Sequence, residues 1–321
     1  MSKKPLILTP PIKDYIWGGT KLREQFGKES DLERLAESWE LSCHKDGHSV
    51  IAEGEYKGRT LAEYLEENPD AMGKNCERFE NFPVLIKLID AKDNLSVQVH
   101  PDNEYALRVE GEYGKTEMWY IVDCDEGASL IFGFKEEISK EEFRRAIEEN
   151  TLLDKVNTVP VKKGDVFFIE AGTLHAIGKG ILIAEIQQNS NTTYRVYDYG
   201  RVGADGKPRE LHVEKALDVT NLEQKRASDD KKIKVNLSGC EAEVLATCEY
   251  FSAVLLEVQG SSAFETDEKS FTHMLVTEGE AEAVFDDTAI KLKKGSSIFV
   301  PAGTGMCRIN GNASIIITSV N

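Results

Sequence analysis

The sequence predicts a mainly β protein made of two related β units with a few helices attached. Two observations support this fold class. Residues 161–175 (VKKGDVFFIEAGTLH) match residues 292–306 (LKKGSSIFVPAGTGM) without a gap, with Lys-Lys-Gly and Ala-Gly-Thr in register, which indicates one structural unit used twice. Short apolar runs also recur along the chain with glycines between them, a spacing typical of a barrel or a double-sheet jelly roll.

The first unit is expected to combine such strands with short helices. Thr60 and Glu63 form a capping box that opens a helix to about Glu67. Residues 82–99 are largely apolar and strand-like, with a turn signal at residues 91–94. The other expected elements are a short helix near residues 105–110, strands within 117–134 and 156–199, and a helix within 208–221.

A helical insertion distinguishes the first unit from the second. Residues 116–118 (Thr-Glu-Met) resemble residues 272–274 (Thr-His-Met), 156 positions further on, whereas the longer repeat recurs after 131 positions. The 25-residue difference coincides with residues 139–147, where Ser139 and Glu142 are spaced as a second capping box. In the second unit, we expect short strands separated by Gly260, Gly279, Gly295, Gly303 and Gly311.

The composition restricts the partners of this protein. Its formal net charge is −17, which argues against nucleic acid and anionic membranes, because both require a basic surface. No apolar run approaches ~18 residues, and the N-terminal run at residues 6–8 is too short for the core of a signal peptide. The six cysteines are scattered without a C-x-x-C pattern, which favours reduced thiols in a cytoplasmic protein.

Four residues can be interpreted as one metal site: Gln98, His100, Glu117 and His175. Gln98 and His100 lie two apart in an alternating run, so they share one face of a strand. Glu117 begins a second strand-like run, and His175 follows a third. Two imidazoles, a carboxylate and an amide oxygen suit a divalent, zinc-like ion with a position left open for water or substrate.

The second unit lacks this ligand set. Met306 stands where the first unit has His175, and nothing like Gln-x-His precedes His273, which is matched to Glu117. The strongly polar residues 223–234 separate the units. We therefore expect residues 1–222 to form an N-terminal metal-binding domain with helical insertions, and residues 235–321 to form a C-terminal β domain without the metal site.

The net charge also bears on substrate capture. An anionic substrate would be repelled by the field of the whole protein, so a local group of cationic side chains must attract it. The candidates near the metal motifs are Lys87, Lys115, Arg195 and Arg201. Glu185 follows Ile181 and Ile183 on one face of a strand, where a buried carboxylate suits proton transfer or the orientation of a ligand.

The motifs together resemble those of the type I mannose-6-phosphate isomerases, which are zinc enzymes on a cupin scaffold. These motifs are Gln-Val-His-Pro, Lys-x-Glu-Met-Trp, Ala-Gly-x-x-His-Ala and Gln-Asn-Ser-x-x-Thr-Tyr-Arg-Val-Tyr-Asp. The resemblance covers most of the chain and implies two cupin-like jelly-roll units. The length is similar to that of the short bacterial form, which lacks the extra helical domain of the long forms.

The resemblance implies a role for each motif residue. The zinc ligands of the family fall on Gln98, His100, Glu117 and His175. The arginine that is important for catalysis and substrate binding corresponds to Arg195. Lysines of the substrate pocket correspond to Lys87 and Lys115, of which Lys115 is also a catalytic candidate, and an acidic residue proposed to move protons corresponds to Glu185.

The activity implied by the resemblance is the interconversion of mannose 6-phosphate and fructose 6-phosphate, with one Zn²⁺ per chain and proton transfer through an enediolate. The motifs identify neither the base nor the oligomeric state. Two other classes stay open. One is a non-haem iron dioxygenase, because cupins often hold iron with two histidines and a carboxylate. The other is a sugar-responsive metal-binding module without turnover.

Overall fold

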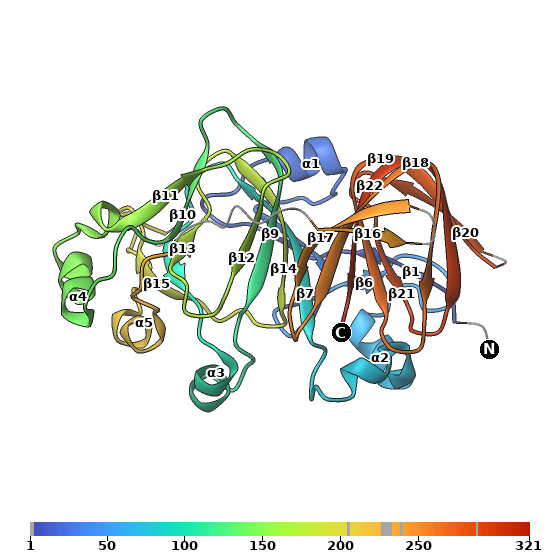
Figure 1. Ribbon diagram of the computed structural model, residues 1–321, viewed down its shortest axis with the longest axis horizontal. Coiled ribbons are helices and arrows are strands. Elements are labelled where there is room, and N and C mark those ends of the chain that lie inside the picture. The colour runs from blue at the N-terminus through green and yellow to red at the C-terminus, as the bar shows by residue number, and fades with distance from the viewer. Residues whose placement is uncertain (1–2, 204–205, 226–232, 238–239, 287) are drawn as a thin grey trace.

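The computed structural model describes residues 3–203, 206–225, 233–237, 240–286 and 288–321, and it has the predicted mainly β architecture. Two β barrels lie side by side, with short helices at the outer end of the first barrel, below both barrels and above the junction between them (Figure 1). The helices in the described ranges are α1 (Lys21–Phe26), α2 (Leu61–Glu67), α3 (Asn103–Val109), α4 (Lys140–Glu148) and α5 (Val213–Val219), with 3₁₀ turns at Pro69–Ala71, Lys74–Cys76 and Leu152–Asp154.

The first barrel consists of two sheets that enclose an apolar core. One sheet has the strand order β12 (Val166–Ile169), β9 (Glu117–Cys124), β14 (Ile181–Gln188), β7 (Val84–Ala91), β3 (Glu37–Leu41) and β2 (Ile12–Lys13). The other has the order β11 (Val156–Pro160), β10 (Ser129–Phe134), β13 (His175–Ala176), β8 (Val97–Val99) and β15 (Tyr194–Tyr197). Trp119 and Ile183 from the first sheet pack in one core cluster with Leu130 and Phe132 from the second. A small hairpin, β4 (Cys43–His44) and β5 (Gly47–His48), lies outside both sheets.

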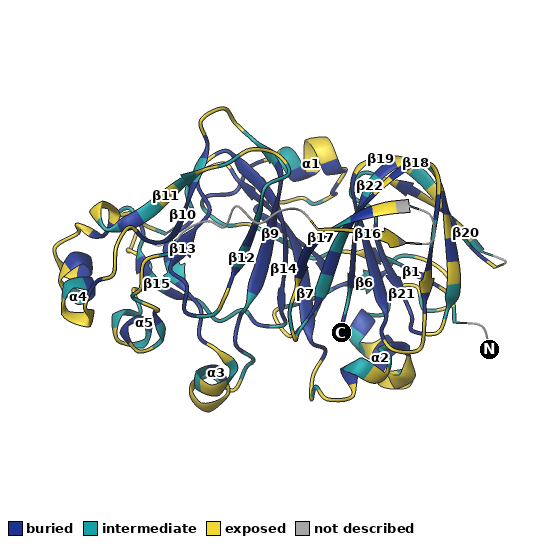
Figure 2. Ribbon diagram, in the orientation of Figure 1, coloured by how far each residue is buried: buried dark blue, intermediate teal, exposed yellow. Residues whose placement is uncertain are grey.

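The outer faces of these two sheets are also covered. Helices α4 and α5 pack on the five-stranded sheet, where Phe143 and Leu217 join a cluster with Val97 and Val99. The outer face of the six-stranded sheet packs against the second barrel, so that Met118 and Phe299 belong to one continuous cluster. Figure 2 shows the result as buried strands along the junction of the barrels and exposed outer sides of the helices. Burial on both faces explains why β7 and β14 consist mostly of apolar residues.

Both predicted capping boxes are present. Thr60 caps α2 through the amide of Glu63, whose carboxylate bonds back to the amide of Thr60, and Ser139 and Glu142 do the same for α4. The helical insertion of the first unit is therefore confirmed. In the described part of the chain, no helix combines the length and the apolar character that crossing a bilayer requires.

The second barrel differs from the expected set of short strands. Its sheet has the order β16 (Ile233–Leu237), β17 (Cys240–Thr247), β18 (Ser252–Thr266), β22 (Gly305–Ser319), β19 (Thr272–Phe285), β21 (Ser297–Val300), β1 (Leu6–Thr9) and β6 (Val50–Ile51), with β20 (Thr288–Lys293) paired to β19. Gly260, Gly279 and Gly311 lie inside its three longest strands, so the expectation that they separate strands was wrong. Gly260 faces Gly311, and both have positive φ. Their backbone freedom permits long strands to bend instead of ending.

Two short N-terminal strands complete the sheet of the second barrel. Strand β1 pairs with β21, and β6 pairs with β1. This sheet therefore crosses the predicted boundary between the units. Most of the polar segment 223–234 lies outside the described residues.

Strand register corrects the predicted correspondence between the two units. Glu117 pairs with Ile169 in the first barrel, and Thr272 pairs with Val300 at the corresponding place in the second. The turn glycines agree, because Gly164 donates to the carbonyl of Ile121 and Gly295 donates to that of Val276. Thr272, not His273, is therefore the counterpart of Glu117. A slip of one residue on a strand moves a side chain to the opposite face.

Candidate metal centre and its cavity

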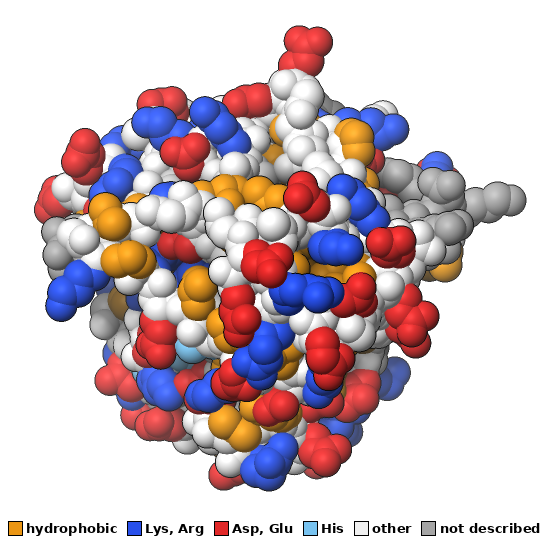
Figure 3. Space-filling view, turned by 90° about the vertical axis from the view of Figure 1, so that its left-hand side faces the viewer, with side chains coloured by type: hydrophobic (Ala, Val, Ile, Leu, Met, Phe, Trp, Pro, Cys, Tyr) orange, Lys and Arg blue, Asp and Glu red, His pale blue; other side chains and the backbone are white. Residues whose placement is uncertain are grey.

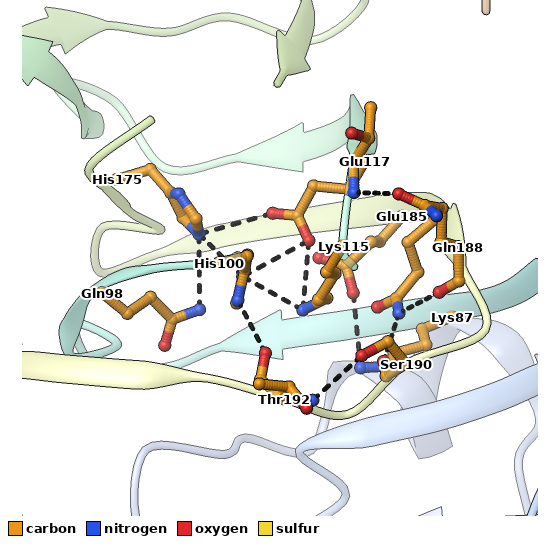
Figure 4. Close-up of polar contacts among 12 residues, drawn as sticks. Lys87, Gln98, His100, Lys115, Glu117, His175, Glu185, Gln188, Ser190 and Thr192 are labelled. Atoms are coloured by element: carbon orange, nitrogen blue, oxygen red, sulfur yellow. Dashed lines mark hydrogen bonds and ion pairs between the residues drawn. The ribbon is translucent and has the colours of Figure 1, made fainter. Parts of the chain in front are cut away.

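Three side chains with metal-binding atoms meet inside the first barrel: His100, Glu117 and His175. His100 directly follows β8, Glu117 begins β9, and His175 begins β13, where it pairs with Gln98. All three are at most 1% exposed. Their metal-binding atoms lie within 4.8 Å of one another, and Figure 4 shows them converging on one point. The three charged or imidazole ligands predicted from the sequence are therefore adjacent in the structure.

Each histidine turns its Nε2 atom toward this point. His100 Nδ1 lies 2.9 Å from the carbonyl oxygen of Thr192, and His175 Nδ1 lies 2.8 Å from that of Thr173. Because a carbonyl oxygen only accepts, each Nδ1 carries the proton and each Nε2 presents a lone pair. Burial lowers the pKa of His175 to about 4, so its ring is neutral. The two Nε2 atoms are only 3.1 Å apart.

The carboxylate of Glu117 adds two more acceptor atoms. Its oxygens lie 3.4 Å from His175 Nε2 and 3.6 Å from His100 Nε2, and neither has a well-directed hydrogen bond from the described residues. Burial raises the pKa of Glu117, and Lys115, 3.1 Å away, opposes this shift. Buried acceptors this close repel one another unless a cation lies among them. The ammonium of Lys115 partly meets this need, because it lies 3.2 Å from His100 Nε2 as well as 3.1 Å from Glu117. A tetrahedral ion with bonds of about 2.0–2.1 Å separates its ligand atoms by about 3.4 Å, so the donor set and spacing suit such an ion.

Gln98 lies at the edge of this cluster. Its Nε2 atom is 3.4 Å from His175 Nε2, and its Oε1 atom accepts from the hydroxyl of Ser96 at 3.3 Å. A rotation of the terminal amide by 180° exchanges the two atoms and would direct Oε1 at the cluster. Coordination by Gln98 therefore stays a prediction.

A cavity of about 270 Å³ opens beside the cluster. Gln98 and Lys115 belong to its wall, together with aromatic side chains at residues 15 and 17. The charged residues of the wall are Glu37, Lys87, Lys115, Glu185, Arg195 and Arg209. The structure thus brings the predicted residues Lys87, Lys115, Glu185 and Arg195 to one cavity next to the metal-binding atoms.

Lys87 is buried between two carboxylates on neighbouring strands. Its Nζ atom lies 3.4 Å from Glu185 and 3.5 Å from Glu37. Burial disfavours the charged form of Lys87, but the two carboxylates outweigh burial and raise its pKa. Burial likewise disfavours the ionised form of Glu185, but Lys115 and Lys87 outweigh it, so the pKa of Glu185 is lowered. Glu185 is therefore ionised at neutral pH.

One oxygen of each carboxylate is fixed by an indole. Trp119 donates to Glu185 Oε2 at 2.8 Å, and Trp39 donates to Glu37 Oε2 at 2.7 Å. The other oxygen of Glu185, Oε1, has no hydrogen bond from the described residues and contacts Lys87. One atom of Glu185 is therefore held in place, and the other is available for proton transfer.

Arg195 lies in the cavity wall, and the hydrogen-bond partners of its guanidinium are neutral. Its Nε donates to the hydroxyl of Ser96 at 3.2 Å, and a terminal nitrogen donates to the carbonyl of Glu210 at 3.0 Å. Arg201, predicted as a cavity cation, instead binds Asp198 and does not belong to the wall. Arg209 takes this place, although it also binds Asp198.

Sequence reasoning missed Glu37 and Arg209. Glu37 lies in the strand-like run Glu-Ser-Trp-Glu-Leu, all of which is buried. A carboxylate inside a fully buried run needs a partner, and Lys87 in the equally buried run of β7 carries the complementary charge. This pair of opposite charges in two buried runs was the signal from which Glu37 could have been predicted as a site residue. Arg209 lies in a loop that carries no such pattern.

Two jelly-roll barrels, one of which holds a buried His-Glu-His cluster beside a charged cavity, define a cupin that can hold a divalent metal ion. Comparison with known proteins extends this result. The family model for the catalytic domain of type I phosphomannose isomerase matches residues 6–126, and the model for the cupin domain of mannose-6-phosphate isomerase matches residues 241–320.

Relatives match over the full length. A mannose-6-phosphate isomerase of Bacillus subtilis is 39% identical, and one of Streptococcus mutans is 38% identical, each over 99% of both chains. A crystal structure of the mannose 6-phosphate isomerase from Bacillus subtilis has a TM-score of 0.92 at 38% identity, covering 98% of this chain and 99% of that one. The apo form of the Salmonella typhimurium enzyme, at 19% identity and a TM-score of 0.79 over 99% of both chains, shares the fold.

This chain belongs to the type I phosphomannose isomerase family. The family, the enzyme class and the cupin fold predicted from the sequence are therefore confirmed.

Proposed function

We propose that this enzyme interconverts mannose 6-phosphate and fructose 6-phosphate with one Zn²⁺ per chain, held by His100, Glu117, His175 and Gln98. The observation that carries the zinc proposal is the group of buried acceptor atoms, with two Nε2 lone pairs 3.1 Å apart and both oxygens of Glu117 beside them. Neutral imidazoles and a carboxylate match the ligand preference of zinc. When bound, the ion would supply Lewis acidity toward a sugar oxygen.

The protein groups would then move the proton. The reaction takes a proton from C2 of the aldose and returns it to C1, and a buried carboxylate that is ionised at neutral pH is a suitable base. Glu185 meets this requirement, because its pKa is lowered and its Oε1 atom is available. The ammonium of Lys87 lies 3.4 Å away and would favour the ionised form of this carboxylate.

Cationic side chains would hold the substrate. Four lysines and arginines but only two carboxylates belong to the described cavity wall, so the cavity can attract a sugar phosphate despite a net charge of −17. Arg195 would stabilise negative charge that develops on the sugar oxygens, because no carboxylate is among its described hydrogen-bond partners. On the face shown in Figure 3, acidic and basic side chains are interspersed, which does not favour a nucleic acid partner.

We also propose a cytoplasmic location. The cysteines at positions 43, 76, 124, 248 and 307 are free, which suits a reducing compartment.

A coupled assay tests this function. Purified protein should convert mannose 6-phosphate to fructose 6-phosphate and should lose this activity on dialysis against a chelator, with recovery on addition of Zn²⁺. Glucose 6-phosphate serves as the matched substrate, because it differs only in configuration at C2. Turnover that is insensitive to complete metal removal would contradict the zinc proposal. Oxygen consumption without isomerisation would favour the dioxygenase, and metal binding without turnover would favour the sugar-responsive module.

A further inference from the structure

A short strap controls the orientation of one metal-binding histidine. Residues 189–193 connect β14 to β15 and lie outside the sheets. The strap contributes to the wall of the 270 Å³ cavity and to that of a second groove of about 560 Å³. The carbonyl oxygen of Thr192 in this strap accepts the Nδ1 proton of His100 at 2.9 Å. The direction of the His100 lone pair therefore depends on where the strap is held.

His175 is oriented differently. Its Nδ1 partner is Thr173, two residues earlier in the same segment, whereas the partner of His100 is 92 residues away in the sequence. A local turn positions His175 by itself. His100 requires a separate segment to be fixed in space, so the contacts that anchor the strap matter for His100 in particular.

Glu112 provides this anchor. Its carboxylate accepts the hydroxyl proton of Thr192 at 3.3 Å and the backbone amide proton of Asn191. Asn191 has a second tie through its side-chain amide, which donates to the carboxylate of Asp46 at 2.8 Å. Other ties hold the beginning of the strap, where Gln187 donates to the carbonyl of Ser190 at 2.6 Å and the amide of Asn189 donates to the carbonyl of Pro83 at 2.9 Å. At Thr192 itself, the hydroxyl connects the strap to Glu112.

Two basic residues contact Glu112 itself. His44 Nδ1 accepts the amide proton of Asp46 at 3.1 Å, so its Nε2 carries the proton and faces Glu112 at 3.7 Å. Lys45 Nζ lies 2.5 Å from the other oxygen of Glu112. The Glu112 side chain is 18% exposed. Burial disfavours its charge, but Lys45 and His44 outweigh burial and lower the pKa of Glu112, so it is ionised at neutral pH.

We propose that Glu112 is a positioning residue of the metal centre, acting on His100 through the strap and the Thr192 carbonyl. This inference rests on the proposed metal site. Glu112 would act on the metal centre through His100 and would not itself bind metal or substrate. Partners that orient a ligating histidine typically change metal affinity by about 10–100-fold when they are removed.

Zinc affinity of the metal-free, full-length protein tests this proposal, measured by competition with a coloured chelator. Glu112→Ala should weaken zinc binding by roughly 10–100-fold. Thr192→Val, which removes the hydroxyl but keeps the carbonyl, should weaken it in the same direction. The double variant should be little weaker than the worse single variant, because both changes break one connection. Glu112→Gln, whose amide oxygen can still accept the hydroxyl proton of Thr192, should restore most of the affinity.

Two matched controls separate positioning from loss of charge. Glu110→Ala removes a carboxylate two residues away that binds Lys215 and Tyr194, and Lys45→Ala removes the ion pair without touching the strap. Both should keep zinc affinity within about twofold, the usual scatter of independent effects. Circular dichroism and thermal denaturation verify that each variant is folded.

The outcomes distinguish this inference from the proposed function. If wild-type protein binds no zinc, or His100→Ala binds it normally, the metal site itself is wrong. If wild-type protein binds zinc but folded Glu112→Ala matches it within twofold, or if the effects of Glu112→Ala and Thr192→Val simply multiply, the positioning role is overturned. Should Glu112→Ala fail to fold, normal zinc affinity in folded Thr192→Val overturns the positioning role instead.

Discussion

Replacing Lys87 by Met should destabilise the enzyme in a way that depends on pH. The ammonium lies 3.4 Å from Glu185 and 3.5 Å from Glu37, and each pair contributes about 5 kcal/mol of Coulomb energy at an effective dielectric constant of about 20. Desolvation of the three buried charges offsets much of this energy. Removing one partner of a buried ion pair typically costs about 3–5 kcal/mol, which corresponds to a decrease in Tm on the order of 10 °C for a chain of this size.

The sign of the pH dependence follows from Glu185. Its pKa is lowered in the folded protein by Lys115 and Lys87 against the effect of burial, so its contribution to stability is present above its unfolded pKa and is lost as pH falls through its folded pKa. Without Lys87, the folded pKa of Glu185 rises, and the folded variant binds more protons than the wild type as the pH decreases. The stability difference should therefore be largest near pH 7–8 and should narrow toward pH 5.

Thermal denaturation from pH 5 to pH 8 measures this difference, and the isomerase assay provides the second readout. Lys28→Met is the control, because Lys28 forms a buried pair with Glu40 at 2.7 Å and binds the carbonyl of Gly295, away from the cavity. Both variants should lose stability, but only Lys87→Met should also lose activity. A Tm for Lys87→Met within about 2 °C of wild type at pH 7, or a difference that widens toward pH 5, would refute this electrostatic account.

Three further outcomes follow from the same geometry. His100→Ala should lose bound zinc and activity together, while Gln98→Ala should keep more of its zinc; elemental analysis that finds full zinc in His100→Ala would contradict the ligand assignment. Arg195→Ala should retain zinc but lose roughly 10²–10³ in kcat, with only partial recovery in Arg195→Lys because a point charge replaces a planar fork; near-normal kcat would make Arg195 structural. His273→Ala should leave activity nearly unchanged, and the purified enzyme should bind one zinc per chain; a second zinc abolished by this substitution would show an additional site.

The sequence was most informative about the site where a polar side chain occupies an inward-facing position of an apolar strand. His100 and Glu117 stand at the ends of strands whose period of two predicts an inward direction, and both are buried as that period requires. The metal cluster could therefore be proposed from spacing and residue type. Lys87 and Glu185 stand opposite each other in β7 and β14, but the sequence does not state which strands pair. Their contact was consequently not predictable from local pattern.

Contacts between residues far apart in the chain could not be predicted from the sequence for the same reason. Glu112 lies in a polar connection where a carboxylate is ordinary, and its importance comes from a strap 80 residues away. The pairing of β1 with β21 joins residues nearly 300 positions apart, although each strand alone is only a short apolar run. Local propensity identifies such elements, whereas packing across the whole chain decides their partners.

The register of β19 explains why His273 cannot act in the second barrel as Glu117 does in the first. In the first barrel, Glu117 and Trp119 face inward while Met118 faces the neighbouring barrel. In the second barrel, Met274 belongs to the apolar interior, and His273 points to the junction, where its Nε2 atom lies 2.9 Å from Ser297 Oγ. An imidazole on the outer face cannot direct a lone pair into the barrel. The match of His273 with Glu117 in the sequence therefore pairs residues on opposite faces, and restoring a site would require a ligand at Thr272 instead.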